Sequence, residues 1–196
     1  MNPWTDQPVL TGEHVTLRPL VPEDRDALQA ASGGGSAIPF YASVWSASDP
    51  DAFLAKIFAA REAGRTMPFT AISPEGAVIG LTRLVRMNAD NRRLEIGGTF
   101  YAPSVRRTGV NTEAKLLLLT HAFEVMDCVV VEIRTDWFNK RSQAAIERLG
   151  AKRDGVLRNH NIMPDGRVRD VAVYSIVASE WPGVKRNLRY LLESHA

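Results

Sequence analysis

The sequence predicts a mixed α/β fold whose sheet is antiparallel in its front half. Three observations predict this fold. The 196 residues are 45% hydrophobic and 23% charged, which are ordinary values for a globular protein. Strand and helix patterns follow one another in the order β-α-α-β-β-β-α-β-α-β-β. Three of the strand patterns come in succession in the middle of the chain, where antiparallel neighbours are expected.

The first half of the chain predicts one strand, two helices and then three strands. Residues 14–18 alternate in character, as a strand does. Helices are expected to begin at Pro22 and Pro50, because proline suits the first helical position. The second helix has apolar residues at helical spacing and is expected to stop near Gly64. Strands are predicted at residues 67–73, 78–86 and 94–101, with a hairpin loop at residues 73–77.

The second half begins with a long helix after Gly109 that has an apolar face as far as Val125. A β-branched run at residues 129–135 predicts a central strand. Asn139 and Gly150 are typical start and stop residues for a short helix between them. The remaining elements are predicted strands at residues 152–162 and 168–177, an Asp165-Gly166 hairpin turn, and a helix from about 179 towards 192.

Composition limits the classes of protein that fit. Lys and Arg number 24 and Asp and Glu 22, so the net charge is +2 and predicts no general nucleic-acid binding. No stretch approaches the roughly 18 apolar residues of a membrane span. One cysteine, Cys128, forms neither an internal disulfide nor a cysteine-based zinc site. We therefore expect a cytoplasmic protein with one domain over residues 1–196, its core at about 9–177 and a C-terminal helical extension at about 179–196.

The segment with the clearest chemistry is Arg106-Arg107-Thr108-Gly109-Val110-Asn111-Thr112. A strand leads into it and a helix leaves it, so unpaired N–H groups and the helix dipole offer positive potential there. Two arginines add charge, which makes this a phosphate-binding arrangement. It is neither a Walker loop nor a dinucleotide fingerprint. The alternative is a solvated pair of arginines followed by an ordinary turn.

This segment resembles the acetyl-CoA pyrophosphate loop of GNAT N-acetyltransferases, written Gln/Arg-x-x-Gly-x-Gly/Ala, although Asn111 stands where that motif has Gly or Ala. Leu94-Glu95-Ile96-Gly97 resembles the strand before the loop. Asn139-Lys140-Arg141-Ser142 resembles the second family motif, and Leu17-Arg18-Pro19-Leu20 resembles the family's opening. The match is nearest to the RimJ/RimL-like subgroup over about residues 9–177. It implies a twisted, mostly antiparallel sheet flanked by helices, with a splayed central parallel pair of strands.

The resemblance also implies a cosubstrate, acetyl-CoA, and no metal. The pyrophosphate would lie on the loop, and the pantetheine arm between a bulged strand and residues 129–135. Asn139 would bond that arm, or serve only as a helix N-cap. The residues expected to bind the cosubstrate are Thr99, Phe100, Tyr101, Arg106, Arg107, Thr108, Gly109, Val110, Asn111, Thr112 and Asn139. For Phe100, packing in the core is an equal interpretation.

Two residues are candidates for proton transfer. An amine must be neutral to attack the thioester, so Glu95 is the candidate general base. The alternative for Glu95 is a strand residue that faces solvent or pairs with Arg92 or Arg134. Ser142 is the candidate acid for the departing thiolate, unless it only satisfies a free N–H in the first helical turn.

Other side chains carry weaker signals. His121 is expected to be packed, and Cys128 to be a small buried hydrophobe. His160 precedes the hairpin and is a candidate to touch the acceptor. Tyr41 and Trp45 would line the acceptor cleft or pack on the surface. His14 carries no signal.

The leading hypothesis is an enzyme that moves acetyl from acetyl-CoA to a primary amine, either a protein N-terminus or a small molecule. An open acidic or polar cleft would favour a peptide, and a closed pocket a small molecule. The alternatives are a non-catalytic acyl-CoA-binding regulatory module and, more weakly, a nucleic-acid binder using arginines such as Arg83 and Arg86. No membrane partner is expected, and a homodimer fits the resemblance.

Overall fold

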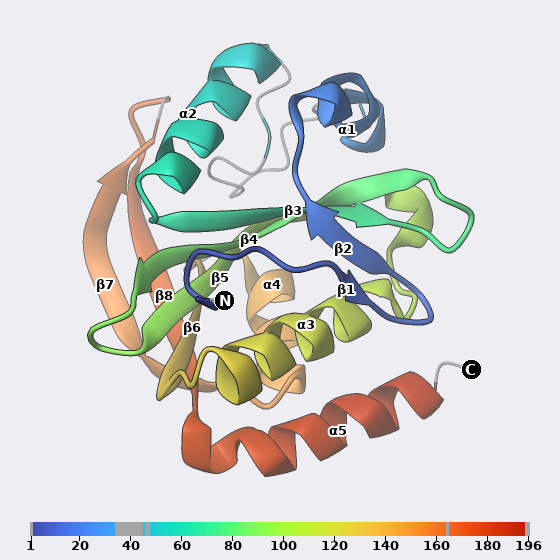
Figure 1. Cartoon of the computed structure of the whole chain (residues 1–196). Helices are drawn as coiled ribbons and strands as arrows, with labels where there is room; N and C mark the ends of the chain where they lie inside the picture. The colour runs from blue at the N-terminus through green and yellow to red at the C-terminus, as the bar shows by residue number, and fades with distance from the viewer. Residues whose placement is uncertain (1, 34–44, 46–47, 164, 195–196) are drawn as a thin grey trace.

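The computed structural model describes residues 2–33, 45, 48–163 and 165–194. Helices and strands alternate along the chain much as the sequence predicts (Figure 1). The elements are β1 (Leu10–Thr11), β2 (Thr16–Pro19), α1 (Arg25–Ala31), α2 (Pro50–Glu62), β3 (Thr66–Ile72), β4 (Val78–Asn88), β5 (Arg93–Tyr101), α3 (Val110–Thr120), β6 (Val130–Asp136), α4 (Lys140–Arg148), β7 (Lys152–Ile162), β8 (Val168–Val177) and α5 (Trp181–Glu193).

Three details differ from the prediction, and a fourth agrees with it. The two-residue strand β1 was not expected, since it is too short to show alternation. The long helix ends as α3 at Thr120 and continues as one π-type turn through His121–Val125. A 3₁₀ turn at Ala178–Glu180 precedes α5, which therefore begins at Trp181. The proline starts at Pro22 and Pro50 are confirmed, although Pro22 begins a 3₁₀ turn that leads into α1.

One sheet contains all eight strands in the order β1-β2-β3-β4-β5-β6-β8-β7. Every neighbouring pair is antiparallel except β5 and β6, so the expected antiparallel front half and central parallel pair are confirmed. The parallel pairing spans three positions, from Arg93↔Val130 to Glu95↔Glu132, and then stops. Both strands continue beyond this point, so they separate towards their carboxyl ends.

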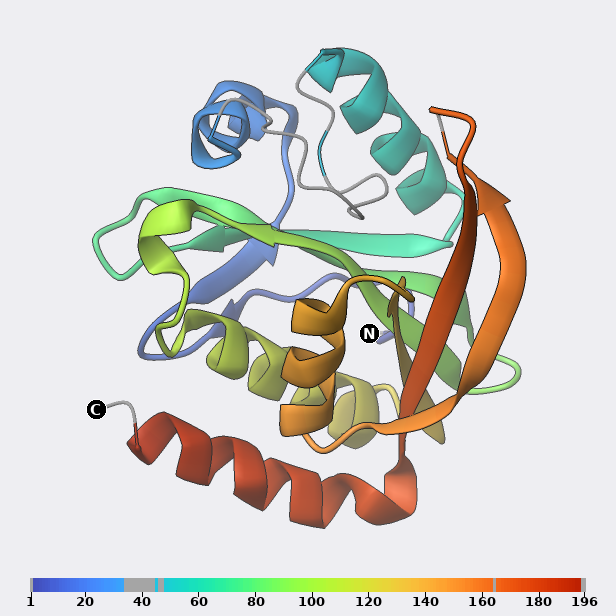
Figure 2. The ribbon, with the colours of Figure 1, turned by 180° about the vertical axis from the view of Figure 1, so that it is seen from behind.

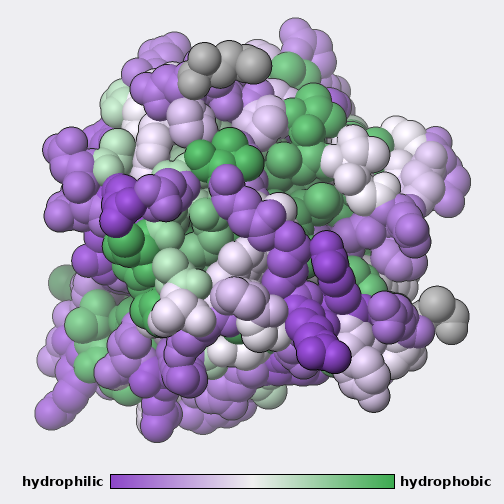
Figure 3. Space-filling view, turned by 60° about the horizontal axis from the view of Figure 1, so that its bottom comes forward, coloured by the Kyte–Doolittle hydropathy of each residue, from purple (hydrophilic) through white to green (hydrophobic). Residues whose placement is uncertain are grey.

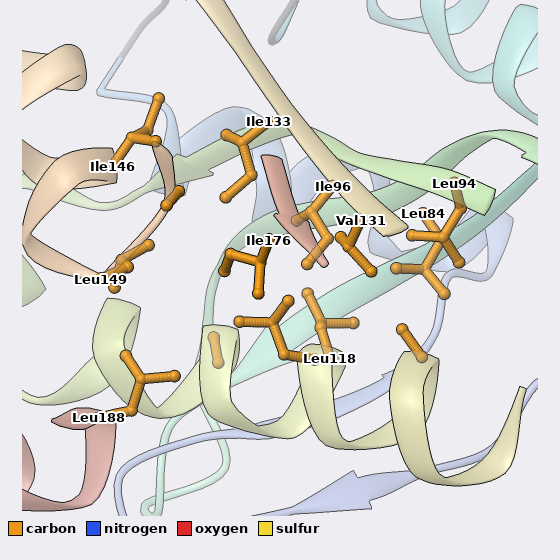
Figure 4. Packing of buried hydrophobic residues seen from close by; sticks show 14 of the residues in the cluster. Leu84, Leu94, Ile96, Leu118, Val131, Ile133, Ile146, Leu149, Ile176 and Leu188 are labelled. Carbon is orange, nitrogen blue, oxygen red and sulfur yellow. The ribbon is translucent and has the colours of Figure 1, made fainter. Parts of the chain in front are cut away.

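Helices cover both faces of the sheet (Figures 1 and 2). Helices α1 and α2 lie on one side, and α3, α4 and α5 on the other. The larger core lies between the sheet and α3, α4 and α5, where Leu94, Ile96, Leu118, Ile146 and Leu188 are buried together (Figure 4). A smaller core under α1 and α2 contains Leu20, Leu28, Leu54, Ile57 and Leu81. Helix α5 thus contributes to the main core and is not a loose extension.

The alternation of β5 between these two cores positions the site. Leu94 and Ile96 face the α3 side, so Glu95 and Gly97 face the α1 and α2 side. Figure 3 shows the surface with the lower edge of Figure 1 brought forward: hydrophilic residues dominate this face, and apolar residues appear as separate patches among them. Among the described residues, no helix has both the length and the apolar character needed to cross a membrane.

Candidate active site

The carboxyl end of β5 contains a bulge. Leu81 pairs with Phe100 and Arg83 with Gly97, so Thr82 lies opposite both Gly98 and Thr99. Gly98 has φ of +58°, a conformation that glycine adopts without strain. The extra residue turns Thr99 to the α3 side of the sheet. There its hydroxyl lies 2.8 Å from that of Thr82 on the neighbouring strand β4.

A lysine lies beneath this bulge. Lys115, in the second turn of α3, is buried and donates a hydrogen bond from Nζ to Thr99 Oγ1 at 3.3 Å. Burial lowers the pKa of Lys115 to about 8, and no carboxylate of the described residues forms an ion pair with it. Nothing in the sequence pattern marks this residue except its place on the predicted apolar helix.

The predicted phosphate loop leads directly into α3. Arg106 and Arg107 are exposed, and Arg107 has φ of +65°. Thr108 donates from its hydroxyl to the carbonyl of Val105 at 2.7 Å, which closes the loop. The first helical hydrogen bond runs from Glu113 N to Gly109 O, so the earlier N–H groups of the helix have no intrahelical acceptor. These donors are what an anion would bind.

Gly109 is the N-cap residue of α3, and Asn111 is the second residue of the helix. The helix therefore begins directly after Gly109, as the sequence predicts. Gly109 has φ of −63°, so backbone strain does not require glycine there. Instead, a Cβ at this position would lie 2.7 Å from the imidazole Cδ2 of His14. His14, which carried no signal in the sequence, packs against the start of the helix.

Glu113 connects the β1–β2 turn to this loop. Its buried carboxylate accepts three backbone hydrogen bonds, from Glu13 at 2.8 Å, His14 at 2.6 Å and Val15 at 2.9 Å. The side chain also fills the space beside Gly12, where a Cβ would lie 2.3 Å from the Glu113 carboxyl carbon. The first turn of α3, the turn before β2 and the phosphate loop are thereby held together.

Glu95 lies on the opposite face of β5, at the last position that pairs with β6. It is 8% exposed, so it does not face solvent. Its carboxylate is 3.0 Å from Arg86 Nε and 3.3 Å from Arg134 Nε. Pairing with Arg134 is as expected, whereas Arg92 pairs with Asp127. Burial raises the pKa of Glu95 above the ordinary carboxyl range, although three neighbouring arginines oppose this.

A cavity of about 370 Å³ opens beside Glu95. Strands β4 to β8 all contribute to its wall, which consists of Arg83, Val85, Arg86, Glu95, Gly97, Gly98, Arg134, His160, Asn161, Arg169 and Val171. His160, which the sequence singled out, also lines this cavity. A second cavity of about 180 Å³ near Trp4 and Arg61 contains none of the predicted site residues.

Helix α4 follows β6 at the end where β5 and β6 have separated. Asn139 is its N-cap, and its side chain accepts a hydrogen bond from Ser142 N at 3.0 Å. The capping interpretation of Asn139 is therefore confirmed. Ser142 is the capped residue, and its hydroxyl forms no hydrogen bond within the described chain, so the interpretation of Ser142 as a satisfier of a free N–H is wrong.

The aromatic residues near the loop divide between the two faces. Phe100 packs in the smaller core, with its ring 5.9 Å from that of Trp45. Trp45 also contacts Phe53 and donates to Gln29, so it packs with these residues and does not line the cavity. Tyr101 faces the α3 side, and its buried hydroxyl has no partner among the described residues. Tyr41 lies outside the described residues.

Two of the weaker expectations are confirmed. His121 is buried within the π-type turn, and burial lowers its pKa. Cys128 is buried too, and burial raises the pKa of its thiol to about 12. Across the described part of the chain, no group of three or more His, Cys, Asp or Glu side chains has a metal-binding arrangement.

A bulged strand that separates from its parallel neighbour, beside a helix start whose first N–H groups lack intrahelical acceptors, defines a class of protein that can bind a long ligand with amide and phosphate groups. The two strands offer unpaired backbone groups to an amide-bearing arm, and the helix offers donors to a pyrophosphate. Residues 14–152 match the family model described as "Acetyltransferase (GNAT) domain". The chain therefore belongs to the GNAT acetyltransferase family, whose members use acetyl-CoA.

Known relatives agree with this assignment. The chain is 32% identical over 111 residues to a protein of Bacillus subtilis (strain 168) named "Putative ribosomal N-acetyltransferase YdaF"; this match covers 57% of the chain and 60% of the relative. A GCN5-related N-acetyltransferase from Brucella melitensis has a TM-score of 0.82 and 28% identity, over 95% of this chain and 86% of that one. Mycobacterium smegmatis RimJ in complex with CoA-disulfide shares the fold, with a TM-score of 0.78 and 22% identity over 96% of each chain.

Proposed function

We propose that this protein transfers the acetyl group of acetyl-CoA to a primary amine, and that the N-terminal amine of a protein is the acceptor. The observation that carries the proposal is the gap between β5 and β6. It begins directly after Glu95, and it lies between the start of α3 on one face and the cavity on the other. The name of the Bacillus subtilis relative, which refers to ribosomal N-acetylation, favours a protein acceptor in the cytoplasm.

The residues of the α3 face fit acetyl-CoA as the first substrate. The N–H groups at Thr108 to Thr112 would bind the pyrophosphate, with Arg106 and Arg107 adding charge. The separated edges of β5 and β6 would bond the amides of the pantetheine arm, near Thr99 and Tyr101. The hydroxyl of Tyr101 is buried on this face and has no partner among the described residues.

The residues of the cavity fit the acceptor. The acceptor amine must lose a proton before it attacks the thioester carbon, and Glu95 is the carboxylate that lines the cavity. Its raised pKa makes it a better base than an exposed carboxylate. A backbone N–H of the bulge would stabilise negative charge on the thioester oxygen. Ser142 would donate a proton to the departing thiolate, since its hydroxyl is uncommitted.

Thiol release tests this proposal directly. Acetyl-CoA is incubated with a panel of N-terminal peptides and small amines; free thiol is followed optically, and the acetylated product is identified by mass spectrometry. Thiol release that depends on the amine supports the enzyme. Binding of acetyl-CoA without thiol release on any amine would instead support the regulatory module.

A further inference from the structure

The cavity beside Glu95 has an excess of positive charge. Four arginines and one carboxylate line it. Two further carboxylates pair with arginines of this wall. Glu132 pairs with Arg134 of the wall and with Arg93. Asp136 pairs with Arg169 of the wall and with Arg167. Among the described residues, the cavity wall and these partners together comprise six arginines and three carboxylates. The surplus of cations in this network faces the space that the acceptor would occupy.

Arg83 is the cation of this network that no carboxylate of the described residues contacts directly, although Glu95 acts on it at longer range. Its side chain forms no ion pair and no hydrogen bond with the described residues, and its Nε is buried. The guanidinium lies against the backbone of Gly98, where a Cβ would be 2.2 Å from an Arg83 nitrogen, and 5.8 Å from the ring centre of Phe53. A guanidinium keeps its charge in proteins, and a partly buried charge is stabilised only when it is paired.

From this geometry we infer that the acceptor carries a negatively charged group, a carboxylate or a phosphate, close to the amine that is acetylated. Arg83 binds that group, with Arg86 and Arg169 beside it. This inference rests on the proposed function, because it specifies the acceptor of the same reaction. For a protein N-terminus, the negative group is an acidic or phosphorylated side chain in the residues that directly follow the first.

The size of the cavity sets how close the two groups must be. A volume of about 370 Å³ is at the small end for a ligand site, so it holds a few residues of a peptide and no more. Glu95 and Arg83 both face this volume from neighbouring strands. An amine beside Glu95 therefore has its anionic partner group within a short chain of bonds.

The same charges explain why an acceptor without an anion is disfavoured. An ammonium group meets four arginines and one carboxylate in the cavity, and a polybasic N-terminus adds more repulsion. An attached anion offsets this repulsion and pairs with Arg83. Neighbouring cations also favour the neutral form of an amine, which is the form that attacks the thioester.

The test compares three peptides that differ at one position: Ser-Gln-Ala-amide, Ser-Glu-Ala-amide and Ser-phosphoserine-Ala-amide. We expect kcat/KM for at least one of the two anionic peptides to exceed that of the Gln peptide by tenfold or more. The ratio between the Glu and phosphoserine peptides identifies the preferred anion. Arg83→Gln should reduce the preference to less than threefold, with the loss in kcat/KM falling on the anionic peptides. Arg25→Gln, on the exposed surface of α1, is the matched control and should keep the full preference.

Equal kcat/KM for all three peptides with the unaltered protein would overturn the inference and leave the proposed acetyl transfer intact. A preference that survives in Arg83→Gln would also overturn it. Should no peptide release thiol, the proposed function fails, and the charge preference is then measured by calorimetry with N-acetylated forms of the same peptides on the CoA-loaded protein. Tighter binding of an anionic form there upholds the anion site, and equal binding overturns it.

Discussion

Replacing Glu113 with Gln should loosen the turn between β1 and β2 and, through it, the phosphate loop. In the protein, one carboxylate oxygen accepts from Glu13 N, and the other from His14 N and Val15 N. A glutamine keeps one acceptor oxygen and places an NH₂ group where the other was. That NH₂ group then faces a backbone N–H, so one hydrogen bond is lost and the remaining two lose their charge assistance.

The structure sets the size of the effect. Hydrogen bonds to charged groups contribute about 1.5–3 kcal/mol, and those between neutral groups about 0.5–1.5 kcal/mol. Losing one charged bond and weakening two others amounts to about 3 kcal/mol, allowing for the exposure of the Glu13 backbone. With a slope near the top of the usual range in urea, about 2–3 kcal/mol per molar, the unfolding midpoint should fall by about 1–1.5 M.

Urea unfolding followed by circular dichroism measures this change. Glu13→Gln is the matched control, because Glu13 is exposed and adjacent to the same turn, and it should shift the free energy of unfolding by less than about 0.5 kcal/mol. CoA affinity should fall in Glu113→Gln as well, since His14 packs on Gly109. If the midpoints of the two variants agree, the three hydrogen bonds do not stabilise the fold and the reasoning is refuted.

Three further substitutions test the predicted site. Gly109→Ala should weaken CoA binding in calorimetry by more than tenfold, about 1.4 kcal/mol, because its Cβ would lie 2.7 Å from His14. Recovery in the double variant with His14→Ala would assign the loss to that contact, and unchanged affinity in the single variant would count against the loop as the pyrophosphate site. Glu95→Gln should lower kcat/KM more for the more basic of two amines, because less of that amine is already neutral. In the unaltered protein the rate should fall as pH drops through the raised pKa of Glu95, because only the carboxylate form acts as the base. Equal small losses for both amines would make Glu95 structural. Ser142→Ala should lower kcat without changing the melting temperature, because Asn139 keeps its hydrogen bond to the backbone N–H, whereas Asn139→Ala should cost about 1 kcal/mol of stability. Normal turnover in Ser142→Ala would exclude it as the acid.

The local elements were predictable because their signals are local. Prolines at helix starts, the β-branched run of β6 and the Asp-Gly turn act on their immediate neighbours, and these elements lie where expected. β1 was missed because two residues show no periodicity. The start of α3 directly after Gly109 was predicted, and it follows the 3₁₀ turn at Pro103–Val105.

The partners of the site residues were harder to predict, because they are distant in sequence. His14 packs against Gly109, which lies 95 residues later in the sequence. No sequence pattern near His14 indicates this contact. The pairing of Glu95 with Arg86 depends on the antiparallel register of β4 and β5. The sequence marked Arg83 only as one of several basic residues. In the structure no carboxylate contacts it directly, because Glu95 and Glu132 pair with other arginines. The resemblance to the family was enough to predict the phosphate loop. The cavity beside Glu95 could be found only from the three-dimensional arrangement.

The sheet consists of two antiparallel blocks, one of β1 to β5 and the other of β6, β8 and β7. Only the short parallel pairing of β5 with β6, which spans three positions, joins the two blocks within the sheet. A ligand that forms hydrogen bonds with both β5 and β6 in the gap would link the two blocks along the rest of these strands. The protein would then resist heat in proportion to its occupancy, by about 2.7 kcal/mol at a hundredfold excess over the dissociation constant. In a cell, its lifetime against proteolysis would follow the supply of the substrate that it consumes.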